Sequence, residues 1–270
     1  MIEYRTVGKT FPGGTVAVGE FSLTLPSHST TVFVGSSGCG KTTLLRMVNR
    51  MVEPSAGQVL IDDVDIATRN PVELRRSIGY VMQHAGLLPH RTVLDNVGTV
   101  PRLNGASRAE TRRRSLEVLE TVGLDPQLAD RYPRQLSGGQ QQRVGVARGL
   151  VSDPNILLMD EPFGAVDPIV RVELQNELLR LQRELGKTIV FVTHDVDEAL
   201  LLGDQVVILS TGGEVAQVGS PAELLANPAS EFVRTFLGLD KAERTLRVEE
   251  TDGRRIVVDG NGRATGVLDG

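Results

Sequence analysis

The stretch Gly35-Ser-Ser-Gly-Cys-Gly-Lys-Thr42 decides the fold of this 270-residue chain. It matches the pattern G-x-x-x-x-G-K-[ST] in full, in which glycines allow backbone N–H groups to turn inward around phosphate oxygens. An apolar run, Thr30–Val34, precedes it, and a helical run, Thr43–Val48, follows it. A helix that begins at such a loop also directs the positive end of its dipole at the anion. The stretch therefore predicts a phosphate-binding loop between a strand and a helix.

The residues of this loop have different expected tasks. Lys41 is expected to neutralise charge on the β- and γ-phosphates, and Thr42 to offer its hydroxyl to Mg²⁺. For Cys39 a low-pKa thiolate at the helix start is one interpretation, and a contribution of its backbone N–H alone is the one that we favour. A glycine-rich turn without a ligand is the alternative for the whole loop, and kinases, GTPases and motor ATPases all share the motif. The expected nucleotide contacts are Gly35, Ser36, Ser37, Gly38, Cys39, Gly40, Lys41, Thr42 and Thr43.

Composition narrows the classes of function. Hydrophobic residues make up 40% and charged residues 23%, which is typical of a folded globular protein. Aromatic residues reach only 4% and the net charge is −5, which disfavours both a stacking platform for single strands and a basic duplex-binding surface. The single cysteine fits a reducing compartment. No apolar run approaches the roughly 18 residues that cross a bilayer, so we expect a cytoplasmic chain that is not itself a membrane span.

Short apolar runs alternate with helical patterns along the chain. Strands separated by helices predict a parallel sheet with right-handed crossovers. The apolar spacing from Val170 to Leu185 predicts a helix that ends at Gly186. Further helices are expected after the caps Asp195 and Ser220. Four buried strands, hydrophobic on both faces, are expected at Thr30–Val34, Ile156–Met159, Thr188–Val192 and Gln205–Leu209.

Residues 86–150 contain no strand candidate. Ser107-Arg-Ala-Glu110 has the pattern of a capping box before a helix that runs to about Val122. The segment is therefore predicted to be a mostly helical insertion into the sheet.

A second site is indicated by the strand that ends in Asp160 and Glu161. An Asp at the carboxyl end of a strand lies beside the phosphate loop in an open parallel sheet, where it can hold Mg²⁺. Glu161 points differently, which suits orienting or deprotonating an attacking water. The alternative is that one of the acids simply caps the turn at Pro162.

The stretch Leu136-Ser-Gly-Gly-Gln140 precedes a helix that we expect to run to about Leu150. Two glycines and a serine at a helix start form an anion-binding nest, although alone they are equally a flexible turn. Here 19 residues, 137–155, separate Leu136 from the acidic strand that begins at Ile156, and the stretch lies downstream of the phosphate loop. That combination distinguishes one family of phosphate-loop proteins from the others.

With these motifs the chain resembles the nucleotide-binding subunit of ATP-binding-cassette (ABC) transporters, over roughly residues 2–240. The resemblance implies an α/β fold of the P-loop NTPase class. A RecA-like, mostly parallel sheet lobe with an antiparallel β region would occupy residues 1–85 and 151–240, and an inserted helical subdomain residues 86–150. ATP and Mg²⁺ are the implied cofactors, and ATP hydrolysis coupled to solute translocation is the implied activity.

The resemblance also assigns roles to single residues. Leu136–Gln140 resembles the signature motif, and Gln83 resembles the Q-loop glutamine that touches Mg²⁺ and relays state to the membrane subunits. Asp167 resembles the D-loop aspartate, and His194 the switch histidine that contacts the γ-phosphate. The implied signature contacts to nucleotide are Ser137, Gly138, Gly139 and Gln140.

The remaining assignments concern the residue that contacts adenine, the catalytic residues and the metal ligands. Phe11 occupies the place of the aromatic residue that stacks on adenine, usually a tyrosine, and Tyr4 is a second candidate. The expected catalytic residues are Glu161, His194, Gln83 and Asp167. The expected metal ligands are Thr42, Gln83 and Asp160.

The family implies a head-to-tail pair of chains, with ATP between one chain's phosphate loop and the other's signature. The sequence supports a second copy independently, because it has one loop and one nest, and a nest needs an anion to face. ATP would close the pair and hydrolysis would let it open. The other implied partners are transmembrane permease subunits and, indirectly, an extracytoplasmic solute-binding protein, with no nucleic acid. The implied location is peripheral, on the cytoplasmic face of the inner membrane.

Within the family, the stretches Asp160–Arg171 and Thr188–Ala199 resemble the osmoprotectant uptake branch. That branch imports glycine betaine, choline, carnitine and related quaternary amines. It usually has Leu and Thr where this chain has Val166 and Val170. Importers for amino acids and other solutes share most of the pattern, and a soluble ABC ATPase acting on ribosomes or DNA is the other alternative.

The tail, residues 241–270, is polar in composition. Ile256–Leu268 predicts a hairpin around Asn261-Gly262, which is marginal by itself and must therefore pack on something or be incomplete. Members of the osmoprotectant branch often carry cystathionine-β-synthase-type (CBS) modules at this end, and Arg255–Gly270 resembles one hairpin of such a module. A remnant and a truncation both remain open.

Overall fold

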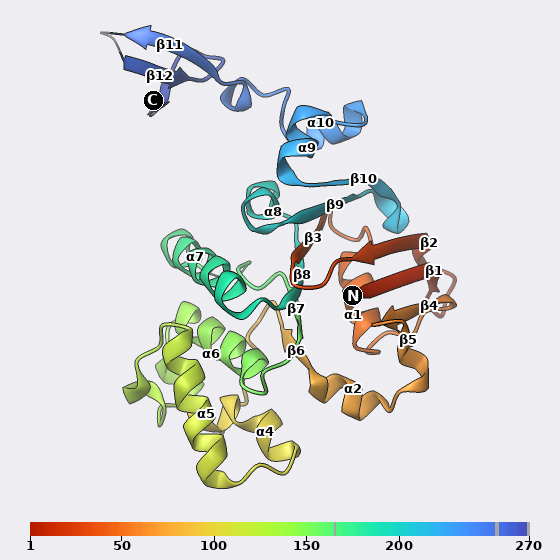
Figure 1. The fold of residues 1–270 in the computed structure, drawn as a ribbon, viewed down its shortest axis with the longest axis vertical. Coiled ribbons are helices and arrows are strands. Elements are labelled where there is room, and N and C mark those ends of the chain that lie inside the picture. Colours follow the sequence, from red (N-terminus) through yellow and green to blue (C-terminus); the bar gives the residue numbers. More distant parts are fainter. Residues whose placement is uncertain (165, 252–253, 269–270) are drawn as a thin grey trace.

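The central element of the fold is a six-stranded sheet. The computed structural model, drawn in Figure 1, describes residues 1–164, 166–251 and 254–268. The strand order is β10 (Val215–Gly219), β9 (Gln205–Leu209), β3 (Thr30–Gly35), β8 (Thr188–Thr193), β7 (Ile156–Asp160), β6 (Ile78–Val81). Only the edge pair β10–β9 is antiparallel within this sheet. The four strands expected from their apolar runs are confirmed, each to within one residue at either end.

The two faces of this sheet carry two separate apolar clusters. Along β8, Ile189 and Phe191 belong to one cluster, and Val190 and Val192 to the other, because successive strand residues point to opposite faces. The first cluster is completed by α6 (Gly138–Leu150), α7 (Pro168–Leu185) and α8 (Val196–Leu202). The second is completed by α1 (Lys41–Val48) and an antiparallel sheet. Helices α1 and α6 therefore lie on opposite faces.

The antiparallel sheet packs near the loop that precedes α1. Its strand order is β2 (Val16–Leu25), β1 (Ile2–Thr10), β4 (Ala56–Ile61), β5 (Val64–Asp65). The backbone of β2 passes so close to Gly40 that a Cβ there would lie 2.7 Å from the carbonyl oxygen of Ala17. Gly40 also has φ 104°, a conformation that glycine adopts without steric cost.

The segment between β6 and β7 contains only helical elements among its residues, all of which are described. It holds α3 (Val93–Val97), α4 (Thr99–Leu103), α5 (Arg108–Thr121), two 3₁₀ turns at Pro126–Leu128 and Pro133–Gln135, and α6. Figure 1 shows these helices gathered on one side of the sheet. Ser107 caps α5 as expected, but the Glu110 carboxylate contacts Arg113 and Arg114 instead of accepting from the Ser107 N–H. Charge-assisted bonds to guanidinium groups are stronger than a bond to a neutral backbone N–H, so the expected box is only half formed.

Three helix ends match their expected signals. Gly186 ends α7 in the left-handed conformation with φ 56°, and Asp195 caps α8. Ser220 and Glu223 form a complete capping box at α9 (Pro221–Ala226). The remaining elements are α2 (Pro71–Ser77), α10 (Glu231–Phe236) and 3₁₀ turns at Ile66–Thr68, Thr211–Gly213 and Ala242–Arg244.

The C-terminal residues form a three-stranded sheet, which Figure 1 shows beyond α10. The expected hairpin is present as β12 (Arg254–Val258) and β13 (Ala264–Val267), and β11 (Arg247–Thr251) adds a strand that the sequence did not indicate. The tail turns back on itself through a bond from the Gly260 N–H to the Ala242 carbonyl, 2.7 Å long. Residues 252–253 and 269–270 of the expected tail lie outside the described residues. Within the described ranges, no helix is both long and apolar enough to cross a membrane.

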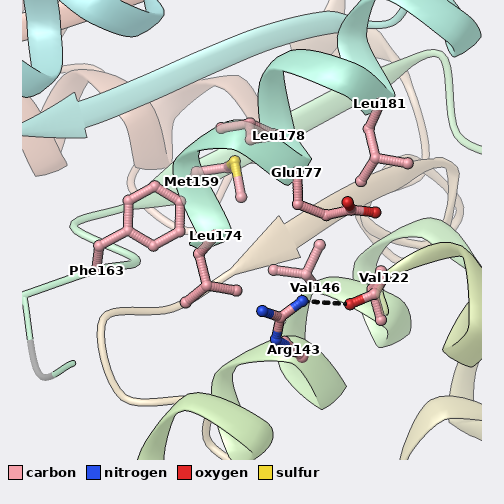
Figure 2. Close-up of a pocket in the computed structure, with 9 residues that line it drawn as sticks. All are labelled: Val122, Arg143, Val146, Met159, Phe163, Leu174, Glu177, Leu178 and Leu181. Carbon is pink, nitrogen blue, oxygen red and sulfur yellow. Dashed lines mark hydrogen bonds between the residues drawn. The ribbon is translucent and has the colours of Figure 1, made fainter. Parts of the chain in front are cut away.

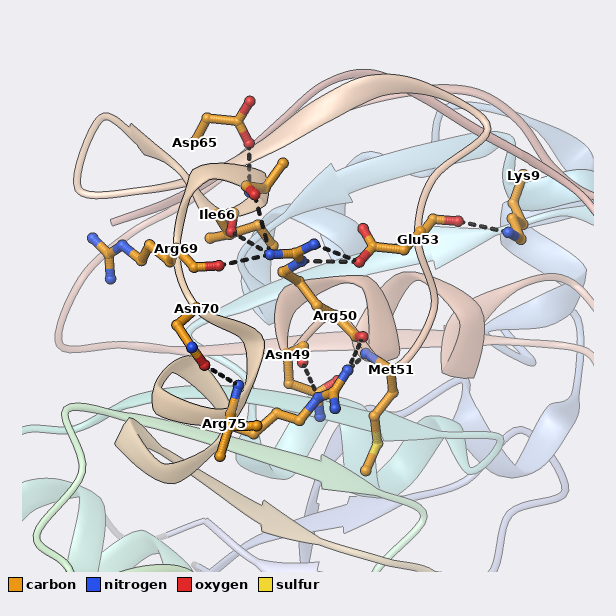
Figure 3. Close-up of polar contacts among 12 residues, drawn as sticks. Lys9, Asn49, Arg50, Met51, Glu53, Asp65, Ile66, Arg69, Asn70 and Arg75 are labelled. Atoms are coloured by element: carbon orange, nitrogen blue, oxygen red, sulfur yellow. Dashed lines mark hydrogen bonds and ion pairs between the residues drawn. The ribbon is translucent and has the colours of Figure 1, made fainter. Parts of the chain in front are cut away.

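The C-terminal end of α1 is fixed by two arginines (Figure 3). Arg75, on α2, donates to the carbonyl oxygens of Asn49 and Arg50. Cationic groups at this end of a helix are favoured by its dipole. The Arg50 guanidinium in turn donates to the carbonyl oxygens of Ile66, Ala67 and Arg69. These contacts hold α1, and with it the loop at its other end, against α2 and the 3₁₀ turn at Ile66–Thr68.

Candidate nucleotide site

The loop between β3 and α1 encloses the side chain of Lys41. The ammonium donates to the carbonyl oxygens of Gly35 and Ser36, each at 2.8 Å, and the residue is only 5% exposed. Ser37 and Gly38 at the tip of the loop are exposed. The positive charge therefore lies inside the curve of the loop, where a phosphate group would be neutralised.

Cys39 does not present its thiol to this loop's outer surface. The residue is 1% exposed and belongs to the apolar cluster around α1. Its Sγ lies 3.8 Å from the Lys41 Nζ, and its N–H donates to the Ser36 carbonyl oxygen at 3.3 Å. The side chain thus packs in the core, and the thiolate interpretation gains nothing from this geometry.

Asp160, at the end of β7, is a buried carboxylate that accepts three side-chain hydrogen bonds. The Thr42 hydroxyl donates to Oδ1 at 2.7 Å, and Arg46 and Tyr80 each donate to Oδ2 at 3.2 Å. Asp160 is 6% exposed, so it depends on these donors. Burial, reinforced by the neighbouring Asp160 carboxylate, raises the pKa of Tyr80 and keeps its hydroxyl a donor.

Arg46 and Tyr80 were not among the residues expected from the sequence. Arg46 lies four residues after Thr42 on α1, and residues at that spacing share one helix face. Tyr80 pairs in register with Leu158 on the neighbouring strand, two residues before Asp160 and on the same face. The helical spacing was a usable signal for Arg46, whereas Tyr80 required the pairing of β6 with β7.

Glu161 lies between Gln83 and His194. Gln83 Nε2 donates to Glu161 Oε2 at 3.1 Å, and His194 Nδ1 is 3.1 Å from the same oxygen. The three residues follow β6, β7 and β8, which are adjacent in the sheet. Glu161 has φ 44°, and its N–H donates to the Val192 carbonyl oxygen at 2.9 Å. A non-glycine residue in this left-handed conformation stores strain of the kind that clusters at functional sites.

Thr42 and Asp160 suit a magnesium ion. Mg²⁺ is usually held by one or two carboxylates together with substrate phosphates, and here a hydroxyl and a carboxylate already lie 2.7 Å apart beside the loop. The described part of the chain has no group of three or more His, Cys, Asp or Glu side chains able to hold a metal alone. Gln83 contacts Glu161 and has no bond to Asp160 among the described residues. The donor set therefore fits a metal shared with phosphates.

The signature stretch, Leu136–Gln140, forms the start of α6. Ser137 accepts from the Gln140 N–H, and the Gln140 side chain accepts from the Ser137 N–H, so the two make a capping box. Ser137 and Gly138 are exposed, whereas a Cβ at Gly139 would lie 2.3 Å from a Val170 methyl at the start of α7. Over the described ranges no hydrogen bond joins residues 137–140 to the loop at 35–43. The structure thus does not bring the two motifs together within one chain.

The other expected residues lie at the edges of the site. The Asp167 carboxylate caps α7 by accepting from the Ile169 and Val170 N–H groups. Phe11 is 38% exposed in the β1–β2 turn, with the Lys9 ammonium 5.2 Å from its ring centroid. Tyr4 is 1% exposed and donates to the Leu44 carbonyl oxygen. Tyr4 is therefore unable to stack on a nucleotide, and Phe11 is the candidate that remains.

A small apolar pocket lies behind the acidic strand (Figure 2). Met159 precedes Asp160 in the chain, Phe163 follows Glu161, and both line the pocket together with side chains of α6 and α7. Arg143 at its edge donates to the Val122 carbonyl oxygen at 2.9 Å. The lining lacks the convergent polar groups that a nucleotide requires, so the pocket is a packing feature between the helices and the sheet.

Comparisons with known proteins agree with this geometry. The family described as "ABC transporter" matches residues 18–164. The chain is 49% identical to the choline transport ATP-binding protein OpuBA of Bacillus subtilis, over 95% of this chain and 66% of that protein. It is 50% identical to the glycine betaine/carnitine/choline transport ATP-binding protein OpuCA of the same species, over 89% of this chain and 63% of that protein. The glycine betaine uptake system ATP-binding protein YehX of Escherichia coli is 49% identical to the chain, over 95% of this chain and 86% of that protein. The chain thus spans about two thirds of the first two relatives.

Solved structures give the same answer for the fold. A dimeric ATP-binding cassette in a post-hydrolysis state, bound to ADP and Pi, superposes with a TM-score of 0.75 at 35% identity, over 82% of this chain and 99% of that one. A part of an ABC transporter complex from Clostridium perfringens superposes with a TM-score of 0.76 at 31% identity, over 84% of this chain and 90% of that one. The fold is that of an α/β P-loop NTPase with an inserted helical subdomain. The chain belongs to the ABC transporter family of ATP-binding cassettes.

Proposed function

We propose that this chain hydrolyses ATP and thereby energises the import of a quaternary-amine osmoprotectant through membrane permease subunits. The observation that carries the ATPase assignment is the Glu161 carboxylate, held by Gln83 and His194 at the ends of three adjacent strands. The solute class is supported by the names of the relatives, which are ATP-binding proteins of choline, carnitine and glycine betaine transport systems. Peripheral attachment to the cytoplasmic face of the membrane, next to the permease, belongs to the same proposal.

The loop would bind the phosphates of ATP. Backbone N–H groups from Gly35 to Thr43 and the Lys41 ammonium would cradle them, and the start of α1 adds its positive dipole end. Thr42 and Asp160 would hold Mg²⁺, which supplies countercharge to the β- and γ-phosphates when it is bound. Phe11 would cover the adenine from the β1–β2 turn.

Glu161 would then act as the general base. Both Gln83 and His194 contact Oε2, and no described residue bonds Oε1, which leaves that oxygen for the attacking water. A base must lie within hydrogen-bond reach of the proton that it accepts. The two neighbours fix the carboxylate, and the exposed His194 ring would contact the γ-phosphate.

A second copy of the chain would complete each site. The helices that begin at the phosphate loop and at the signature stretch, α1 and α6, lie on opposite faces of the sheet, so one chain's Ser137–Gln140 would need another chain's nucleotide. The solved dimeric cassette is a precedent for such a pair in this family. Asp167, the cap of α7, would face the partner copy.

The test is ATP-dependent uptake by vesicles that carry the whole complex with its permease and binding protein. We expect uptake of radiolabelled glycine betaine, carnitine or choline, abolished when ATP is omitted. Uptake of an amino acid without any quaternary amine would refute the solute class alone. Absence of ATP hydrolysis by the assembled complex, or purification with ribosomes or DNA instead of a permease, would refute the transport ATPase.

A further inference from the structure

Helix α7 carries two polar side chains, one turn apart, that contact the segment following His194. Arg171 lies 3.6 Å from the Asp195 carboxylate, and Gln175 Nε2 donates to Glu198 Oε1 at 3.0 Å. Residues four apart lie on the same face of a helix. Asp195 is the residue after His194 and caps α8, on which Glu198 lies. Both contacts therefore fasten the His194 segment to α7.

The Gln175–Glu198 pair is buried, with exposures of 7% and 5%. Burial raises the pKa of Glu198, while hydrogen bonds from Thr193 and Gln175 act in the opposite direction. A buried polar group without its partner is costly. The relative position of α7 and α8 is thus set by a directional contact as well as by apolar packing.

Local capping of α8 does not require the Glu198 side chain. Asp195 Oδ1 accepts from the N–H groups of Asp197 and Glu198. In a capping box the third residue would reach back to the Asp195 N–H, but the Thr193 hydroxyl accepts that N–H at 3.0 Å. Glu198 is consequently directed at α7, unlike Glu223 in the complete box of α9. Its contact joins two helices and does not terminate one.

Helix α7 also begins where two other motifs meet. Its cap is Asp167, and Val170 in its first turn packs against Gly139 of the signature stretch. We propose that Gln175 and Arg171 are positioning residues for His194. Through Glu198 and Asp195 they hold its imidazole against Glu161. The arrangement of these two site residues therefore depends on the position of α7. This inference rests on the proposed ATPase function.

The first experiment exchanges the two members of the buried pair in the assembled complex. Gln175→Leu and Gln175→Glu each remove the amide–carboxylate bond, whereas the double variant Gln175→Glu/Glu198→Gln rebuilds it in the opposite direction. We expect each single variant to lower kcat for ATP hydrolysis by about 10- to 100-fold, because a small misplacement of a catalytic group costs this much. The KM for ATP should stay within about twofold, since the phosphate loop and Lys41 are untouched. The exchanged pair should recover most of the lost kcat.

The matched control is Gln182→Leu, the same substitution two turns farther along α7 and away from His194. It should keep the wild-type kcat. Gln175→Leu that folds and keeps the wild-type kcat would overturn the proposal. If Gln175→Leu fails to fold, the comparison of Gln175→Glu with the exchanged pair decides, and an exchanged pair no more active than Gln175→Glu would also overturn it.

A second measurement does not depend on ATP hydrolysis. The chain has four histidines, so the ring signals of His194 can be assigned in NMR spectra by comparison with His194→Gln. We expect these signals to move in Gln175→Glu and to return in the exchanged pair. Signals that stay unchanged in every variant would refute positioning of His194, even if wild-type hydrolysis were absent and the proposed function had failed on its own.

Discussion

Replacing Glu161 by Gln tests the proposed base with little disturbance of the structure. The amide oxygen can accept from Gln83 at the place of Oε2, so the contact at 3.1 Å is retained. The backbone keeps its bond to the Val192 carbonyl oxygen in either case. We therefore expect a change in the free energy of unfolding of less than about 0.5 kcal/mol, as for substitutions that keep local contacts.

The expected loss lies in the chemical step. A positioned general base contributes about 10²–10⁴-fold to the rate, which corresponds to roughly 2.7–5.4 kcal/mol of activation free energy. ATP affinity should be unchanged, because the loop and Lys41 are intact. The assay is phosphate release by the assembled complex under single-turnover conditions, with nucleotide binding measured separately. Glu184→Gln, at the far end of α7, is the matched control.

Two outcomes would refute this reasoning. Wild-type phosphate release by Glu161→Gln would show that another group takes the proton. Loss of ATP binding together with hydrolysis would show that Glu161 holds the nucleotide and does not act on the attacking water.

Three further changes have defined expected results. Lys41→Ala should weaken ATP binding itself, measured by equilibrium titration, because it removes the charge inside the loop; an unchanged affinity would contradict the phosphate site. Tyr80→Phe should lower the free energy of unfolding by about 1–2 kcal/mol in urea titrations, since it removes a bond to a buried carboxylate; stability equal to wild type would mean that Thr42 and Arg46 satisfy Asp160 without Tyr80. Glu198→Gln should reduce the dependence of stability on pH. Because burial raises the pKa of Glu198 in the folded state, its contribution is complete below the unfolded pKa and is lost as pH rises through the folded pKa. Wild-type stability should therefore fall more than that of the variant over this interval, and parallel curves would contradict the shift.

The strands and helix ends that depend on local sequence patterns could be predicted from the sequence. The apolar runs located four strands of the central sheet, and Gly186, Asp195 and Ser220 marked helix ends where the structure has them. These signals depend on residues within a few positions of each other. The acids at the end of β7, Asp160 and Glu161, were also found, because a buried strand that ends in two carboxylates is unusual.

Contacts that depend on the order of the strands in the sheet could not be predicted from local patterns. Gln83 and His194 were proposed by resemblance and Glu161 from its place at the end of a strand, but their meeting at one carboxylate depends on the adjacency of β6, β7 and β8. The bond from Tyr80 to Asp160 depends on the same pairing. Likewise, the choice between Phe11 and Tyr4 required burial, which places Tyr4 in the core. Roles that need a second copy, such as those of Asp167 and the signature stretch, stay predictions.

The phosphate loop and the signature stretch begin helices on opposite faces of one sheet, and this placement has a genetic consequence. In a head-to-tail pair, a copy with a defective loop spoils one site, and a copy with a defective signature also spoils one site. When the two kinds of copy pair with each other, both defects fall in the same site and the other site is wholly wild type. Two alleles that are inactive alone, Lys41→Ala and Ser137→Arg, should therefore complement each other when they are co-expressed. Failure of stably formed mixed pairs to hydrolyse ATP would mean that a single intact site is insufficient, or that each copy works alone.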